Sequence, residues 1–288
     1  MTRRLKIAPL IFVQVEMTWS PLPDPNVLNV DELTQFHRAL QKLGFSQKQE
    51  LEFTWQELSL SGADSALKSR SQIRHIFSNP ERDCQVEITR EKVSIKQSRY
   101  AGFEALFTLA KDVISLLEAV EDIRNTGVGV VSIHYVDLFI PSKGRQLEEY
   151  VSSQLIPFSP ALSNILAKQR TASSVILLEK SDAKIRDIAV RLNIYQADGG
   201  KMPIFVPVEL QEQQQEAAMR LFLPEIDFDE NVEYGLMDIR HASKFVKQEK
   251  FGDVNKGEEL RSLYQIASNV FWDILSEPAK EEWGYSDE

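Results

Sequence analysis

The chain has 288 residues, of which 43% are hydrophobic and 26% charged, and its formal net charge is −10. A chain of this length buries enough surface to fold as one large domain or two small ones without a metal or disulfide staple. The acidic balance disfavours a protein that coats nucleic acid, because phosphate binding draws on clustered Lys and Arg.

Cysteine usage and hydrophobic run lengths indicate where the protein is located. The single cysteine, Cys84, excludes an intrachain disulfide and fits a reducing compartment, so we expect a cytoplasmic protein. The apolar run after Arg3-Arg4 is short and ends in Gln14 and Glu16, which predicts a strand rather than a signal peptide. No apolar run reaches the roughly 18 residues that a membrane span needs.

The first third of the chain predicts a strand, a helix and a meander. Residues 6–19 are β-branched and aromatic, as in a strand, and the proline-rich stretch after Ser20 ends it. Asn29 and Glu32 form a capping-box pattern for a helix that Gly44 ends in the left-handed conformation. Further strands are predicted at residues 50–60, 72–77 and 84–89.

The central unit is a strand at residues 92–96, a turn at Ala101-Gly102 and a long helix, followed by a second strand at 128–140. The helix is predicted because its apolar residues recur at spacings of three and four. These residues are Phe103, Leu106, Phe107, Ala110, Val113, Ile114, Leu117 and Val120.

The remainder begins after Pro141, which we expect to be the boundary between two halves. A short helix at 147–155 and further helical residues at 159–167 precede the strands. Strands are predicted at 174–178, 185–196, 203–210, 219–223 and 234–241, with a hairpin at Asp198-Gly-Gly between the second and third of them. A helix that starts at Asn255 closes the chain.

The closing helix matches the central one without a gap at a constant offset of 157 residues, so that Leu260 aligns with Phe103 and Ala267 with Ala110. Any two amphipathic helices share some spacing, and this remains the alternative explanation. The predicted fold is α+β, with internally duplicated antiparallel sheets that each carry a long amphipathic helix on one face. The halves are 1–141 and 142–288, packed together as one compact unit.

Several segments resemble a sporadically distributed bacterial family that has no assigned activity. The segments are Ala8-Pro-Leu-Ile-Phe-Val-Gln-Val-Glu-Met, Gln97 to Phe107, Val131-Ser-Ile-His-Tyr-Val-Asp-Leu, Pro141 to Leu155, Leu236-Met-Asp-Ile-Arg-His and Trp283-Gly. They resemble that family's Ala-Pro strand, Tyr-Val-Asp strand, Leu-Asp-x-Asp-His strand and closing Trp-Gly, in the same order over nearly the whole chain. The scattered occurrence of the family is what is expected of genes on mobile or defence islands.

Two positions depart from the family pattern. His134 stands where an arginine is usual, and Arg240 stands where an acid is usual. If that arginine and that acid form an ion pair in the family, His134 and Arg240 cannot reproduce it.

Candidate catalytic residues are His134, Asp137, Asp238 and His241, but no motif among them is specific enough to name a reaction. A three-residue offset along a strand places His134 and Asp137 on opposite faces, and the same holds for Asp238 and His241. A site that joins His134 and His241 across the two halves is one hypothesis. The sequence predicts no metal site and no cofactor, because no histidine has metal-ligand spacing.

Three functions are therefore carried forward. The leading one is a non-enzymatic protein-interaction module, an accessory or neutralising partner in a mobile or defence-type gene cluster, with a homodimer as one form of the interaction. Aromatic residues near the ends of both halves would line its partner surface; they are Trp19, Tyr135, Trp283 and Tyr285. The alternative is that such aromatics fill the core, and this is the preferred explanation for Trp55 and Trp272. The alternatives are a hydrolase that uses His134, Asp238 and His241, and a nucleic-acid-binding regulator with a basic face. That basic face would comprise Arg70, Arg74, Lys92, Lys96 and Arg99.

Overall fold

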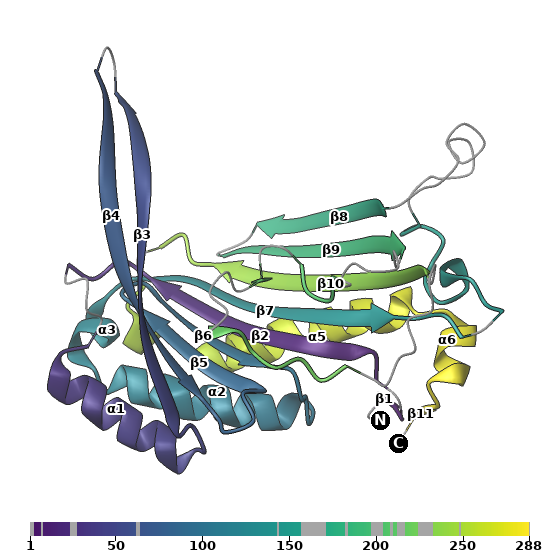
Figure 1. The fold of residues 1–288 in the computed structure, drawn as a ribbon, viewed down its shortest axis with the longest axis horizontal. Coiled ribbons are helices and arrows are strands. Elements are labelled where there is room, and N and C mark those ends of the chain that lie inside the picture. Colours follow the sequence, from purple (N-terminus) through teal and green to yellow (C-terminus); the bar gives the residue numbers. More distant parts are fainter. Residues whose placement is uncertain are drawn as a thin grey trace.

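The computed structural model describes most of the chain, and nine of its strands form one antiparallel sheet (Figure 1). The described residues are 3–6, 8–23, 28–61, 64–142, 144–156, 171–181, 184–196, 204–207, 210–211, 217–223, 233–247 and 249–287. The strands of the sheet are β2 (Leu10–Trp19), β3 (Gln47–Ser61), β4 (Asp64–Ser78), β5 (Cys84–Thr89), β6 (Lys92–Gln97), β7 (Val128–Phe139), β8 (Thr171–Ser181), β9 (Ile185–Gln196) and β10 (Glu233–Lys244). Their spatial order is β3-β4-β5-β6-β2-β7-β10-β9-β8.

The chain follows a similar path on both sides of the central strands β2 and β7, with four strands beyond β2 and three beyond β7. After β2 the chain reaches the edge at β3 and returns strand by strand until β6 pairs with β2. After β7 it reaches the opposite edge at β8 and returns until β10 pairs with β7. Each return is followed by a long helix, α2 (Phe103–Glu118) or α5 (Lys256–Ile274).

Helices cover one face of this sheet, which we call the helix-covered face (Figure 1). The predicted stripe of α2 is confirmed, because Phe103, Leu106, Ala110, Val113, Ile114 and Leu117 are all buried. Each buried Leu or Val side chain contributes roughly 1.5–3 kcal/mol relative to an exposed one. Where α2 meets α5, Phe103 stacks on Tyr264 with ring centroids 3.7 Å apart, and Arg261 pairs with Glu104 at 2.8 Å.

Shorter helices complete this layer. In α1 (Val30–Lys42) the predicted capping box is present: the Asn29 side chain accepts hydrogen bonds from the backbone of Asp31 and Glu32, and the Glu32 side chain accepts one from the Asn29 backbone. Gly44 follows with φ of 97°, as expected of a glycine that ends a helix. The other α-helices of the described residues are α3 (Glu121–Asn125) and α6 (Glu277–Glu282).

No helix of the described residues packs on the other face, which we call the open face. An irregular segment, residues 204–207 and 217–223, crosses it, and we call this segment the strap. Hydrogen bonds hold the strap at two places. Ile204 N donates to Tyr234 Oη on β10 at 3.0 Å, and Ser98 Oγ, just after β6, donates to the carbonyl of Arg220 at 2.6 Å. Its apolar side chains pack on a second, smaller cluster, which contains Ile11, Phe12, Val136, Leu138, Tyr234 and Leu236.

The fold prediction is confirmed at the level of an antiparallel sheet with helices on one face, but the two expected sheets are one continuous sheet. Residues 204–207 and 219–223 are irregular rather than strands. Met219, Leu221 and Leu223 pack on the sheet instead of pairing with it, so their alternation reflects an extended chain that lies flat on the open face. Of the helix predicted at 147–155, only a 3₁₀ turn at Leu147–Glu149 forms. The predicted hairpin at 198–200 and the helical residues 159–167 lie outside the described residues.

The two ends of the described chain meet. β1 (Arg3–Leu5) pairs with β11 (Tyr285–Asp287) in a separate two-stranded sheet. None of the helices in the described ranges is long and apolar enough to cross a membrane.

Candidate functional site

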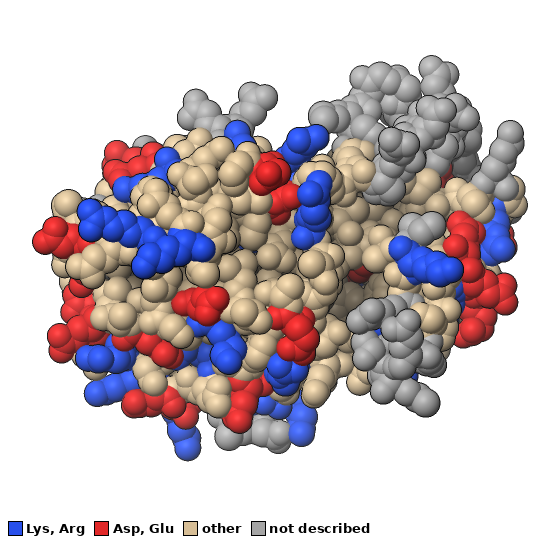
Figure 2. Space-filling model, turned by 90° about the horizontal axis from the view of Figure 1, so that it is seen from below, with Lys and Arg blue, Asp and Glu red and all other residues tan. Residues whose placement is uncertain are grey.

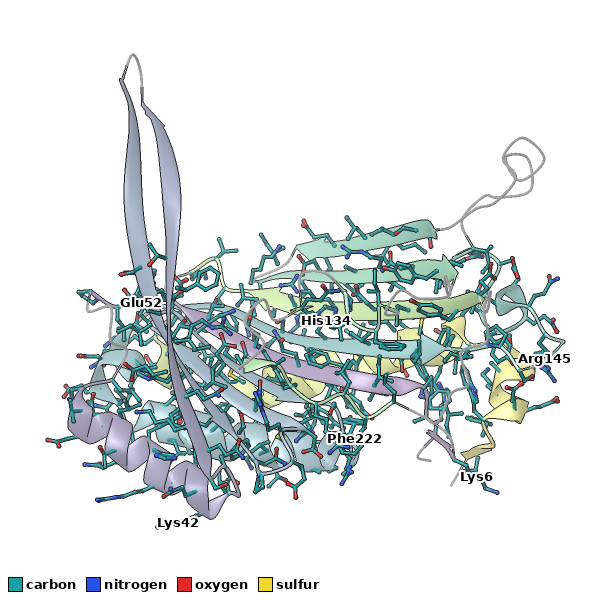
Figure 3. All side chains as sticks on the ribbon, in the orientation of Figure 1. Lys6, Lys42, Glu52, His134, Arg145 and Phe222 are labelled. Carbon is teal, nitrogen blue, oxygen red and sulfur yellow. The ribbon has the colours of Figure 1, made fainter. Side chains whose placement is uncertain are left out.

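His134 and Asp238 meet on the open face, near the middle of the sheet. Figure 3 labels His134 over the central strands of the sheet, with Phe222 of the strap below it in this view. His134 Nε2 lies 2.8 Å from Asp238 Oδ1, and both side chains are less than a tenth exposed. Arg191 Nη1 approaches the second carboxylate oxygen of Asp238 at 3.7 Å. This arrangement is a buried His–Asp pair with an arginine at its border.

The register of the strands explains this contact. Cross-strand partners in an antiparallel sheet present their side chains on the same face. His134 lies between Gln14 on β2 and Arg240 on β10, and Asp238 is one diagonal step from His134. Arg240 is half-buried and forms no ion pair or hydrogen bond in the described part of the chain.

His241 lies on the helix-covered face, away from this pair. Its cross-strand partners are Ile133 and Ile188, and its Nδ1 is 3.0 Å from the carbonyl of Leu263 on α5. Burial lowers the pKa of His241, and the hydrogen bond to Leu263 opposes that effect only in part. His241 is therefore a packing residue between β10 and α5, and the geometry does not join it to His134.

Asp137 also lies beneath the helices, as the three-residue offset from His134 predicts. It is only 3% exposed, and it forms no hydrogen bond or ion pair in the described part of the chain. Burial raises the pKa of its carboxyl group from 3.8 to about 8. The pKa values of Tyr135 and Tyr100 are raised mainly by burial, and Asp137 is one of several groups that raise them further.

Most of the predicted binding aromatics are part of the core. Trp19 is 3% exposed and its Nε1 donates to the carbonyl of Arg90 at 2.9 Å. Trp283 is 7% exposed and packs against Phe139 and Tyr150. Tyr285 and Trp272 are half-buried and contact each other edge to face, and the side chain of Trp55 lies outside the described part. These aromatics offer little surface to a partner.

Exposed apolar residues occur instead on β8, at the edge of the sheet. Its central residues Val175, Ile176, Leu177 and Leu178 are 49%, 37%, 73% and 58% exposed. Among the described residues β8 pairs with β9 along one side only, so its other side presents backbone N–H and C=O groups without a neighbouring strand in that part of the chain.

Comparison with known proteins identifies no family. No protein-family model matches the chain, and no curated protein matches it. The resemblance described above therefore rests on its motifs alone.

The proposed basic face carries cations that are already paired. Arg74 and Lys96 both bind Glu87, at 3.0 and 2.8 Å. Lys92 pairs with Glu16 at 3.2 Å, and Arg99 approaches Asp83 at 3.6 Å. The side chain of Arg70 is not among those described. Figure 2 shows basic and acidic side chains interspersed on the face it presents, which is unlike the contiguous basic surface that phosphate binding needs.

Within the described residues, no group of three His, Cys, Asp or Glu side chains is arranged to hold a metal ion. Sequence reasoning missed the exposure of β8 and the influence of Asp137 on Tyr100. The run Val175–Leu178 is equally compatible with a buried strand, and Tyr100 lies in the segment Gln97 to Phe107, to which the sequence assigns no role. Only the strand order and the helix packing show where these residues lie in the fold.

Proposed function

We propose that this protein is a protein-binding module that receives an extended strand of another polypeptide along β8. The observation that carries the proposal is the exposure of four consecutive apolar residues, Val175 to Leu178, on an edge strand. A strand added to a sheet edge forms main-chain hydrogen bonds, and alternate side chains then make contacts on the two faces.

The opposite edge of the same sheet supports this interpretation by contrast. In the described part of β3 every second residue from Lys48 to Glu52 is charged, Glu50 included. Charges along an edge are a common protection against unwanted strand pairing. β8 has no charge between Ser173 and Leu178, and Glu179 and Lys180 are confined to its end.

Apolar burial favours a partner strand on the β8 edge. Leu177 is 73% exposed, and full burial of a leucine side chain is worth about 1.5–3 kcal/mol. A partner strand that shelters Leu177 and its three neighbours therefore gains several kcal/mol from apolar burial before any hydrogen bond is counted. An accessory or neutralising role in a mobile or defence-type gene cluster would use such an edge, in keeping with the family resemblance.

The test is affinity purification of tagged protein from its native cell, with the variants Leu177→Lys and Val30→Lys. Val30 is the matched control because it is 80% exposed and lies on α1, distant in the chain from β8. We expect one stoichiometric partner with the wild type and Val30→Lys, and at least a tenfold loss with Leu177→Lys. A partner held equally by all three proteins would exclude β8 as the contact. A wild-type dimer lost only in Leu177→Lys would identify the partner as a second copy.

A hydrolase is the second candidate, and the His134–Asp238 contact at 2.8 Å is the observation that favours it. An acid–base pair of this kind orients the imidazole for proton transfer. The residues directly beside His134 on the open face are Gln14 and Arg240, neither of which is a nucleophile. A panel of ester, phosphoester and amide substrates, with His134→Gln as the control, tests this candidate. Turnover by the wild type that His134→Gln abolishes would support it.

We also infer that the two halves arose by internal duplication. The shared chain path from β2 to α2 and from β7 to α5 supports this inference, as does the contact of Glu104 with Arg261, which occupy equivalent positions at the offset of 157. We propose that the repeat boundary lies before β7 rather than at Pro141, since this path begins again at β7. Superposition of β2, β6 and α2 on β7, β10 and α5 tests the inference. Helix residues that coincide at a different offset would contradict it.

A further inference from the structure

The edge strand β8 is polar at both ends and apolar in the middle. Within Thr171–Ser181 the exposed apolar run Val175 to Leu178 follows Ser173-Ser174 and precedes Glu179-Lys180. Two antiparallel copies of such a strand bring the apolar centres together and leave the polar ends beside each other. In polarity, β8 is therefore complementary to a second copy of itself.

The pairing of β8 with β9 shows on which face of the sheet each of these side chains lies. Leu178 pairs with Ile188, which belongs to the core beneath the helices. Because successive side chains of a strand alternate between faces, Leu178 and Ile176 lie on the helix-covered face. Leu177 and Val175 lie on the open face. A partner strand must therefore match apolar side chains on both faces at once.

Symmetry restricts how two copies of β8 can pair. When two antiparallel copies continue one sheet, the twofold axis is perpendicular to the sheet, and each face of one copy continues as the same face of the other. Cross-strand partners share a face, so opposite residues are an even number of positions apart in the sequence. An axis that brings the apolar runs together therefore passes beside one residue, either Ile176 or Leu177.

An axis beside Leu177 gives the better match. It places Leu177 opposite Leu177 of the second copy on the open face, and Ile176 opposite Leu178 of the second copy on the helix-covered face. An axis beside Ile176 would place Leu178, which is 58% exposed, opposite Ser174. Leu177 and Leu178 are the most exposed of the four apolar residues, and both gain an apolar partner only with the axis beside Leu177.

The charges at the end of β8 are compatible with this register. Glu179 of one copy lies opposite Val175 of the other, and Arg191 lies beyond Val175 on the same face. The strands of Glu179 and Arg191 are then two strand spacings apart, about 10 Å, which is within the combined reach of these two long side chains. Lys180 lies opposite Ser174. No like charges face each other directly, and the acid lies toward an arginine.

The other edge of the sheet favours pairing of β8 with β8. A head-to-tail contact between β8 of one copy and β3 of the next would leave a free edge at each end and would add copies without limit. The charges from Lys48 to Glu52 on β3 disfavour that contact. Pairing of β8 with β8 uses the same edge in both copies, so the assembly closes at two.

We propose that the strand received by β8 is β8 of a second copy of this chain, antiparallel to it and centred on Leu177. The two nine-stranded sheets then join into one, with the helices of both copies on the same face. This inference rests on the proposed function, for which it names the partner.

Sedimentation velocity of the purified protein tests the dimer. We expect dimers for the wild type and for Val30→Lys, which is the matched exposed control on α1. Leu177→Lys should self-associate at least about tenfold more weakly, because a lysine at the centre of the contact faces its own copy. An unchanged far-ultraviolet circular dichroism spectrum shows that this variant is folded.

Disulfide cross-linking tests the register. Cys84 is the only cysteine, so Cys84→Ser provides a background without thiols. In this background Leu177→Cys should form a disulfide-linked dimer under mild oxidation, since opposite Cβ atoms are about 5 Å apart. Ile176→Cys should form no such dimer alone but should link to Leu178→Cys when the two proteins are mixed. Val30→Cys should form none.

The outcomes separate this inference from the proposed function. A monomeric wild type that captures a different polypeptide through β8 in the affinity purification above would overturn the inference and leave the proposed function standing. A monomer that captures nothing through β8 would overturn both. A dimer that Leu177→Lys does not weaken would place the contact elsewhere and refute the inference. Self-linkage of Ile176→Cys in place of Leu177→Cys would refute the register.

Discussion

Asp137 gives the folded protein a pH dependence of unusual sign. In the unfolded chain its carboxyl group ionises near its ordinary pKa of 3.8, whereas in the folded protein burial holds the pKa at about 8. Between these values the folded state keeps a proton that the unfolded state has lost. Raising the pH therefore favours unfolding, and the stability that the protonated Asp137 contributes is lost progressively from about pH 4 to about pH 8.

The magnitude follows from the interval between the two pKa values. One pKa unit corresponds to about 1.4 kcal/mol, so the stability lost across the whole interval is about 6 kcal/mol. Asp137→Asn replaces the carboxylic acid by a neutral group of the same shape and removes the linkage. We expect the free energy of unfolding of the variant, relative to that of the wild type, to increase by about 1.4 kcal/mol for each pH unit between 5 and 8.

The assay is urea denaturation followed by tryptophan fluorescence at pH 5, 6, 7 and 8, with the difference between variant and wild type plotted against pH. The difference removes the other titrating groups, which both proteins share. Asp112→Asn controls for the loss of a surface carboxylate, because Asp112 is exposed on α2, and should stay within about 0.5 kcal/mol of the wild type. A difference for Asp137→Asn that is constant with pH would refute the reasoning.

Three further predictions concern stability. Burial raises the pKa of Glu87, but Lys96 and neighbouring cations outweigh burial and hold this pKa at about 2. The stability that the Glu87 carboxylate contributes is therefore present above its ordinary pKa of 4.5 and is lost as the pH falls toward 2. Glu87→Gln should cost about 3 kcal/mol at pH 7 and flatten the acid limb of a urea stability profile; an unchanged limb would contradict this. Lys256 is 1% exposed, donates to two backbone carbonyls and pairs with a carboxylate. Lys256→Met should therefore lower the free energy of unfolding by about 3 kcal/mol. A loss below about 1 kcal/mol would show that water replaces these contacts. Gly102 has φ of 115°, so Gly102→Ala should destabilise by about 1 kcal/mol in thermal unfolding, whereas Gly257→Ala, in the first turn of α5, should be neutral or stabilising; equal effects would argue against backbone strain at Gly102.

Local patterns predicted the three long helices α1, α2 and α5 well because the chemistry of these helices is local. The spacing from Phe103 to Leu117 defines one face of α2 wherever the helix packs, and the Asn29–Glu32 box is complete within four residues. The same holds for the opposite-face placement of His134 and Asp137, which depends only on the period of a strand.

Features that depend on long-range pairing could not be read from the sequence. The His134–Asp238 contact joins residues 104 positions apart and requires the register of β7 with β10. Val175 to Leu178 form a continuous apolar run, which is typical of a buried strand, and only the position of β8 at the end of the strand order leaves it exposed. The single sheet likewise follows from the pairing of β2 with β7, which no local pattern encodes.

The central claim is that β8 receives a strand of another protein, and photocrosslinking in the native cell tests it most directly. A photoreactive amino acid at Leu177 should form a covalent adduct with one polypeptide, whose crosslinked segment is extended and apolar, while the same amino acid at Val30 should form none. Adducts absent at Leu177, or identical from both positions, would contradict the account and return attention to the open face around His134.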